Sequence, residues 1–205
     1  MFTSGMSGTA QYTFSILTFI VAIPSAIKVF NWISTMHKAS INPEIPFLWA
    51  VTFIFVFMIG GFSGLVLGAL ATNVHVHDTA FVVAHFHFIV FGGVGFAFFA
   101  AMHYWYPKMF GRMYDKAWAK VGWAFFTVGF LTLYSPMFYL GMIGMPRRYY
   151  DYLPEFHAAN ILSSLGSWVM AFGLAITIIN LFRSAKNGPI AEINPWHGKT
   201  LEWTV

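Results

Sequence analysis

Two histidines in one apolar stretch, His85 and His87, are the residues of this sequence best suited to holding a redox cofactor. Residues two apart on an α-helix are separated by about 200°, so the two imidazoles point to opposite sides of one helix and cannot share a metal ion. Each can hold its own cofactor, and imidazole is a standard axial ligand of heme iron. The alternative is that both histidines hydrogen-bond to neighbouring helices.

Three basic residues lie where a charge needs a partner. Arg147 and Arg148 follow Met145-Pro146. Adjacent guanidinium groups at a membrane surface need anionic partners, either cofactor propionates or lipid headgroups. Lys28 lies three residues after Ser25, so the two share a helix face. A buried lysine can pass protons, whereas a lysine near a helix end can extend to the membrane surface.

The remaining histidines give weaker signals. His77 and Asp78 precede the apolar stretch that contains His85 and are expected at the outer end of that membrane span. The sequence predicts no specific role for His75. Four others lie in loops or near the ends of apolar stretches and are expected to be ordinary interfacial residues: His37, His103, His157 and His197.

Composition predicts a protein whose solvent is lipid. Of 205 residues 58% are hydrophobic and only 9% are charged, whereas a soluble domain is about a quarter charged. The absence of cysteine excludes disulfides, thiolate metal sites and iron–sulfur clusters. The net charge of +4 comes without a basic run, so no nucleic-acid partner is expected.

Five apolar stretches are long enough to cross about 30 Å of hydrocarbon as helices. They are Tyr12–Ile33, Pro46–Leu70, Phe81–Tyr106, Ala117–Met142 and Ala158–Phe182. The predicted fold is therefore all-α, a polytopic membrane bundle. Residues 1–183 form the five-helix segment and residues 184–205 a polar tail.

Basic residues predict the orientation of the bundle, because cytoplasmic loops are enriched in lysine and arginine. Arg147 and Arg148 lie on one side, and the tail shares the other side with the first and third loops. The tail is expected in the cytoplasm and the start of the chain outside. The basic residues on the tail's side are Lys38, Lys108, Arg112, Lys116, Lys120, Arg183, Lys186 and Lys199.

Several motifs together resemble subunit I of the heme-copper oxygen reductases of bacteria. They are Ile23-Pro24-Ser25-Ala26-Ile27-Lys28-Val29-Phe30, His77-Asp78-Thr79, Val82-Val83-Ala84-His85-Phe86-His87, Gly144-Met145-Pro146-Arg147-Arg148-Tyr149 and the final Asn194–Trp203. Two positions depart from common family residues. Ala80 stands where an aromatic residue is frequent, and Ser25 stands where threonine is frequent.

The resemblance implies roles for the residues that carry it. His85 would be the axial ligand of a high-spin heme and His87 an axial ligand of a low-spin heme, with heme of the a type expected. Arg147 and Arg148 would bind heme propionates, and His77 and Asp78 would bind magnesium. Lys28 and Ser25 would belong to a proton pathway.

The resemblance also implies what surrounds the chain. It would be the C-terminal part of a twelve-helix subunit in a bacterial inner (cell) membrane, truncated at Met1-Phe2-Thr3. Copper would be held only by the full-length subunit. The expected partners are the missing N-terminal part, subunits II and III, membrane lipid, and cytochrome c, which would donate electrons through subunit II.

Three functions follow as alternatives. The first is a proton-translocating cytochrome c oxidase that reduces oxygen to water, present here as an incomplete fragment. The second is a quinol oxidase of the same superfamily, whose members often carry asparagine where Asp78 stands. The third is a helical bundle that binds heme or transports a solute without catalysing a reaction.

Overall fold

Long apolar helices make up most of residues 2–204, the residues that the computed structural model describes. Five helices in this range are long and apolar enough to cross a membrane, which confirms the five predicted spans. The part of the chain that the structure describes contains no β-strand, so the all-α prediction is also confirmed. The elements are α1 (Gly8–Met36), α2 (Ile45–Gly68), α3 (Leu70–Val76), α4 (Ala80–Phe86), the π-helix η1 (His87–Gly95), α5 (Phe96–Phe110), α6 (Lys116–Met142), the 3-10 turn η2 (Pro154–Phe156), α7 (His157–Asn187) and the 3-10 turn η3 (Leu201–Trp203).

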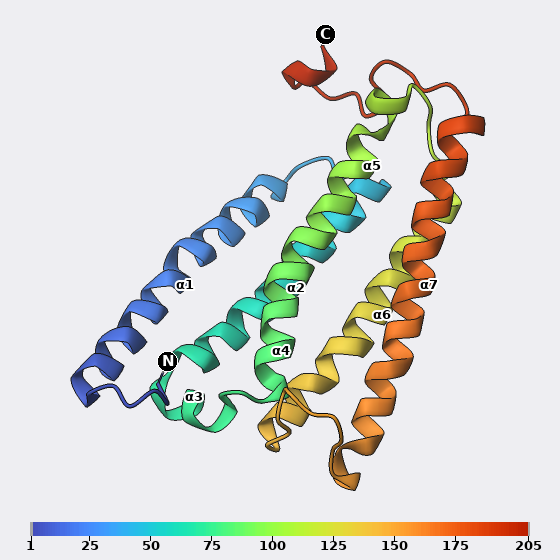
Figure 1. Cartoon of the computed structure of the whole chain (residues 1–205). Helices are drawn as coiled ribbons and strands as arrows, with labels where there is room; N and C mark the ends of the chain where they lie inside the picture. Colours follow the sequence, from blue (N-terminus) through green and yellow to red (C-terminus); the bar gives the residue numbers. More distant parts are fainter. Residues whose placement is uncertain (1, 205) are drawn as a thin grey trace.

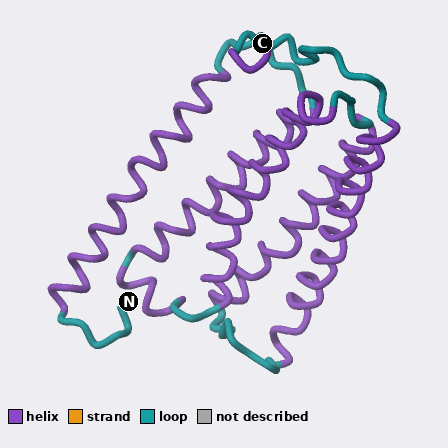
Figure 2. Tube along the Cα trace, turned by 45° about the horizontal axis from the view of Figure 1, so that its top comes forward, coloured by secondary structure: helices purple, strands orange, loops and turns teal. Residues whose placement is uncertain are grey.

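The long helices run side by side as a slanted bundle (Figure 1). Helix α1 lies at one edge next to α2, α5 lies in the middle, and α6 and α7 form a pair at the other edge. The loops gather at the two ends of the bundle (Figure 2), and the first and last described residues lie at opposite ends. An odd number of spans produces this arrangement.

Local sequence fixes several helix ends. Ser7 caps α1 by accepting a hydrogen bond from Ala10 N, and Asp115 caps α6 by accepting from Ala117 N and Trp118 N. Helix α5 ends at Gly111, whose φ of 66° is the left-handed conformation that terminates many helices.

Small residues bring α6 and α7 into close contact. A Cβ atom added to Gly129 would lie 2.2 Å from Met170 N, and one added to Gly166 would lie 2.4 Å from Leu133 N. Lipid tails are as apolar as leucine, so close van der Waals contact is a main source of helix association in a membrane. This pair forms a rigid wall of the bundle.

Aromatic rings fill the space between that wall and the central helices. Trp49 of α2, Phe96 of α5 and Phe126 of α6 are fully buried, and their ring centroids lie 5.3–5.5 Å apart. Aromatic pairs prefer edge and tilted arrangements at such distances. The core therefore fixes α2, α5 and α6 relative to one another, and these elements also position the two histidines.

The third span is one continuous helix of three parts, α4, η1 and α5, running from Ala80 to Phe110. Its middle part is π-helical, a rare conformation that occurs frequently at functional sites. Gly92 lies in this part, and a Cβ atom there would be 2.3 Å from Val56 Cγ1 of α2. The glycine thus allows the wide π-helical turns to pack against α2.

Candidate functional site

His85 faces α2. Its Nδ1 lies 2.9 Å from Ser63 Oγ and 3.1 Å from the carbonyl oxygen of Gly60. Gly64 leaves space for the ring, because a Cβ atom there would be 3.1 Å from His85 Cε1. Two hydrogen-bond acceptors and a glycine of one helix therefore hold this half-buried imidazole.

The hydrogen bonds of His85 determine its tautomer. Ser63 donates its own proton to Gly60 O at 2.7 Å, so its oxygen is left to accept. Both groups near Nδ1 are then acceptors, which requires the proton to be on Nδ1. The lone pair of the neutral ring consequently resides on Nε2.

His87 faces α6. Its ring stacks on that of Tyr134, with centroids 4.2 Å apart and planes inclined by 18°. Its Nδ1 donates to Val83 O, one helical turn earlier, at 2.8 Å. Because a carbonyl oxygen can only accept, Nε2 of His87 also carries the lone pair.

The two histidines thus face different neighbours, as the spacing of about 200° predicts. Across the described residues, no hydrogen-bond partner contacts Nε2 of either ring. Histidines that bind metal characteristically donate their other ring N–H to a carbonyl or carboxylate, which orients the ring and raises its basicity. The arrangement therefore suits two separate axial ligands, one on each side of the span.

A second cluster lies at the end of the bundle where α4 begins and α6 ends. Asp78 forms an ion pair with Arg147, with 2.6 Å between Oδ1 and Nη2. Its Oδ2 lies 3.4 Å from His77 Nε2. Asp78 adopts a φ of 56°, a left-handed conformation that aspartate tolerates better than most residues.

Backbone hydrogen bonds tie this cluster together. Ala80 N donates to Met145 O at 2.9 Å, and Arg147 N donates to Asp78 O at 3.0 Å. Nearby, a Cβ atom on Gly141 would lie 2.0 Å from Phe81 N. The loop that follows α6 is thereby fixed to the start of the helix that carries the histidines.

Other predicted site residues lie apart from these clusters. Arg148 is exposed, and no acidic partner for it lies among residues 2–204. Lys28 is exposed on α1, and Ser25 donates to Val21 O at 3.3 Å rather than contacting Lys28. In the region that the structure describes, no three His, Asp or Glu side chains converge on a possible metal position.

The expectation for His103 was wrong. This residue lies within the third span, is fully buried, and stacks beside Trp49 with ring centroids 6.0 Å apart. Its Nδ1 donates to Phe99 O at 2.7 Å, the same one-turn contact that His87 makes. That contact alone therefore does not distinguish a ligand, and the difference is that His103 Nε2 is sealed inside the protein.

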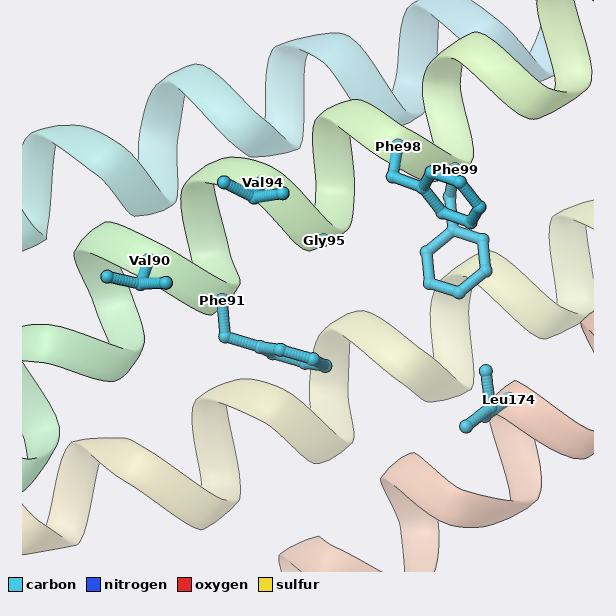
Figure 3. Close-up of a pocket in the computed structure, with 7 residues that line it drawn as sticks. All are labelled: Val90, Phe91, Val94, Gly95, Phe98, Phe99 and Leu174. Atoms are coloured by element: carbon cyan, nitrogen blue, oxygen red, sulfur yellow. The ribbon is translucent and has the colours of Figure 1, made fainter.

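An apolar hollow of about 390 Å³ lies further along the third span (Figure 3). Phe91, Val94 and Phe98 line it from the third span, and Leu174 lines it from α7. Phe91 packs against Phe130 of α6, the helix that His87 also contacts. The hollow offers no polar ligand, but it extends the apolar surface on the His87 side.

Comparison with known proteins decides the family. A sequence model of the Cytochrome C and Quinol oxidase polypeptide I family matches residues 1–169. The chain belongs to this family. The cytochrome c oxidase subunit 1 of Bacillus subtilis (strain 168) is 38% identical over 208 residues, which cover 100% of this chain and 33% of that protein. The cytochrome c oxidase subunit 1 of Thermostichus vulcanus is 40% identical over 205 residues, which cover 100% of this chain and 37% of that protein.

The fold agrees with membership of the oxidase family. A heme-copper terminal oxidase dimer solved by cryo-electron microscopy superposes with a TM-score of 0.82 at 27% identity, covering 93% of this chain and 39% of the solved chain. The chain spans about a third of the length of the curated relatives it matches. The oxidase family implies hemes and copper in general, and the five long helices agree with a multi-pass membrane protein.

Proposed function

We propose that this chain is the C-terminal part of a heme-copper oxidase subunit I and that His85 and His87 ligate two different hemes. The observation that supports this most directly is that the two rings contact different helices, α2 and α6, and that each has its Nδ1 in a hydrogen bond while its Nε2 has no partner among the described residues. His85 would hold the high-spin heme on the α2 side. His87 would hold the low-spin heme, of the a type, on the α6 side.

The remainder of the chain supports this geometry with rigid contacts. Heme iron supplies the redox chemistry by which such oxidases reduce oxygen to water. The protein orients the ligands: Ser63 and Gly60 fix the ring of His85, and Tyr134 fixes the plane of His87. Phe86 lies between the two histidines in sequence, and its ring centroid is 4.3 Å from that of His87. The apolar hollow near Phe91 would provide room for apolar heme substituents.

The polar end of the bundle has a supporting role in the proposal. Arg147 and Arg148 would bind heme propionates, with Arg147 already oriented by Asp78. His77 and Asp78 would contribute to a magnesium site, since a carboxylate suits a hard cation. Asp78 is engaged by Arg147, and the described part of the chain offers no third ligand. Further ligands would have to come from subunit II or water.

Proton delivery and electron donation complete the proposed function. Lys28 and Ser25 on α1 would lie on a proton pathway that starts at the cytoplasmic side of a bacterial inner membrane. The C-terminal tail would lie on the same cytoplasmic side. Electrons would come from cytochrome c through subunit II, which the names of the curated relatives favour. The N-terminal part of the subunit would supply the copper ligands, and subunit III would complete the complex.

The test is a set of substitutions in the full-length oxidase complex. His87→Ala is expected to remove the low-spin heme signal from the absorption spectrum and leave the high-spin signal, and His85→Ala is expected to do the reverse. His103→Asn is the matched control, because His103 shares the span and the one-turn hydrogen bond. Retention of both heme signals in His87→Ala would contradict the proposal.

The electron donor needs a separate measurement. The complex is expected to oxidise reduced cytochrome c and not ubiquinol. Turnover with ubiquinol alone would instead support the quinol oxidase alternative, which the family description includes.

A further inference from the structure

A second hollow, of about 850 Å³, lies between the start of α6 and the end of α7. This is the end of the bundle at which the C-terminal tail begins (Figure 1). Its lining is apolar toward the bundle centre, with Trp118, Phe172 and Ile179, and polar at the end, with Arg183 and Asn187. Such sorting along the helix axis matches the acyl chain and headgroup of a phospholipid.

The hollow faces away from the packed core. On α7, Leu174 and Leu181 pack against the buried aromatic cluster. Phe172 and Ile179 each lie two residues earlier, a rotation of about 200°, and both side chains are exposed. Phe172 and Ile179 thus lie on the outer side of the α6–α7 wall, opposite the side that His87 contacts, whereas Tyr114 of the buried cluster lines the inner part of the hollow.

The charges of the lining favour an anionic ligand. Arg183 has no acidic partner within residues 2–204. Lys116 forms an ion pair with Glu44 at 2.7 Å, and Asp115 caps the start of α6. Among the described residues, Arg183 is therefore the basic residue of the lining that lacks an acidic partner, and its guanidinium suits a phosphate because it can form two parallel hydrogen bonds.

We propose that this hollow binds one anionic phospholipid. The phosphodiester would pair with Arg183, and an acyl chain would lie along Phe172 and Ile179. This lipid proposal requires only that α6 and α7 span a membrane, and it does not depend on the heme assignment.

The experiment uses the full-length oxidase complex, delipidated in detergent and titrated with dioleoylphosphatidylglycerol or dioleoylphosphatidylcholine. Native mass spectrometry counts the bound lipids, and the heme spectrum confirms that each variant is intact. Arg183→Gln is expected to weaken phosphatidylglycerol retention about fivefold, the effect of one cation at an anionic surface, and to weaken phosphatidylcholine retention less, because the choline cation offsets the charge of its phosphodiester. Ile179→Trp, which fills the apolar part, is expected to reduce retention of both lipids.

Lys186→Gln is the matched control, because Lys186 is exposed on the same helix but does not line the hollow. It is expected to weaken retention less than about twofold. Equal retention in Arg183→Gln and the parent complex, or an equal loss in both charge variants, would overturn the proposal. So would finding the hollow filled by polypeptide from the rest of this subunit or from another subunit.

Discussion

Replacing Ser63 by alanine tests how the proposed high-spin heme ligand is held. Ser63 is buried, and its oxygen accepts a hydrogen bond from Nδ1 of His85 at 2.9 Å. In Ser63→Ala the ring keeps a second acceptor, Gly60 O at 3.1 Å, so Nδ1 is not left without a partner. The expected effect is therefore that of one hydrogen bond, about 1 kcal/mol, rather than the larger loss that follows complete removal of an outer partner.

The direction of the change in the midpoint potential of the high-spin heme follows from the electronic effect of that hydrogen bond. Donation from Nδ1–H makes the imidazole a stronger base, which favours the oxidised iron. Removing one acceptor should raise the midpoint potential of the high-spin heme. A free energy of about 1 kcal/mol is about a fivefold change in the equilibrium constant, which corresponds to up to about 40 mV for one electron.

Spectroelectrochemical titration of the full-length complex measures both hemes at once. The low-spin potential should stay unchanged, because His87 is anchored to Val83 and Tyr134 instead. Ser15→Ala is the matched control: Ser15 is also buried and donates to Gly68 O at 2.7 Å, but it does not contact His85. A shift in the low-spin heme, or the same shift in both variants, would refute the reasoning.

Three further predictions concern packing and charge; thermal unfolding of the purified complex measures all three, and limited proteolysis is added for the last. Gly129→Ala should destabilise it by about 2 kcal/mol or more through overpacking against α7, whereas Gly61→Ala, with open space around it, should change little. Tyr114→Phe should cost little, because the buried hydroxyl has no partner within the described residues. Burial, with a smaller contribution from the charge of Glu44, raises the pKa of Tyr114. As pH rises, the tyrosine of the unfolded state therefore loses its proton before that of the folded state, and the free energy of unfolding should fall above about pH 10. This fall should be smaller in Tyr114→Phe. Asp78→Asn should cost about 1 kcal/mol, since its side chain is half-exposed, and should increase proteolytic cleavage near Arg147; unchanged cleavage would contradict the role of that ion pair.

The sequence predicts the spans well because hydropathy alone determines them. All five were confirmed; four of the helices extend beyond the predicted limits by up to several residues, whereas α2 ends at Gly68, before the predicted limit at Leu70. The outward extensions carry polar and aromatic residues, as in Lys116 at the start of α6 and Phe110 at the end of α5. Such residues lie readily at a membrane surface, so composition gives a weak signal for helix ends there.

The opposite orientation of His85 and His87 could also be predicted, because helical geometry fixes the angle between residues two apart. Their partners could not. Ser63 is 22 residues away from His85, and nothing in its local sequence separates it from other membrane serines. The pairing of Asp78 with Arg147 likewise depends on how a distant loop packs. His103 was misjudged because nearness to a span end was taken for exposure, whereas its neighbours Trp49 and Tyr114 cover it.

The π-helical segment η1 interrupts the regular α-helical turn of the third span, so side chains before and after it can face directions that one regular α-helix would not allow. A π-helix uses more residues per turn than an α-helix, so it changes the direction in which every later side chain points. The direction of His85 in α4, and of His87 at the first position of η1, can therefore differ from the direction in which Phe96 and the other rings of α5 face the aromatic core. Deleting one residue between 92 and 95 would rotate the helix on one side of the deletion by about 100° relative to the other side. Either the imidazoles or the aromatic rings would then point about 100° away from their present neighbours.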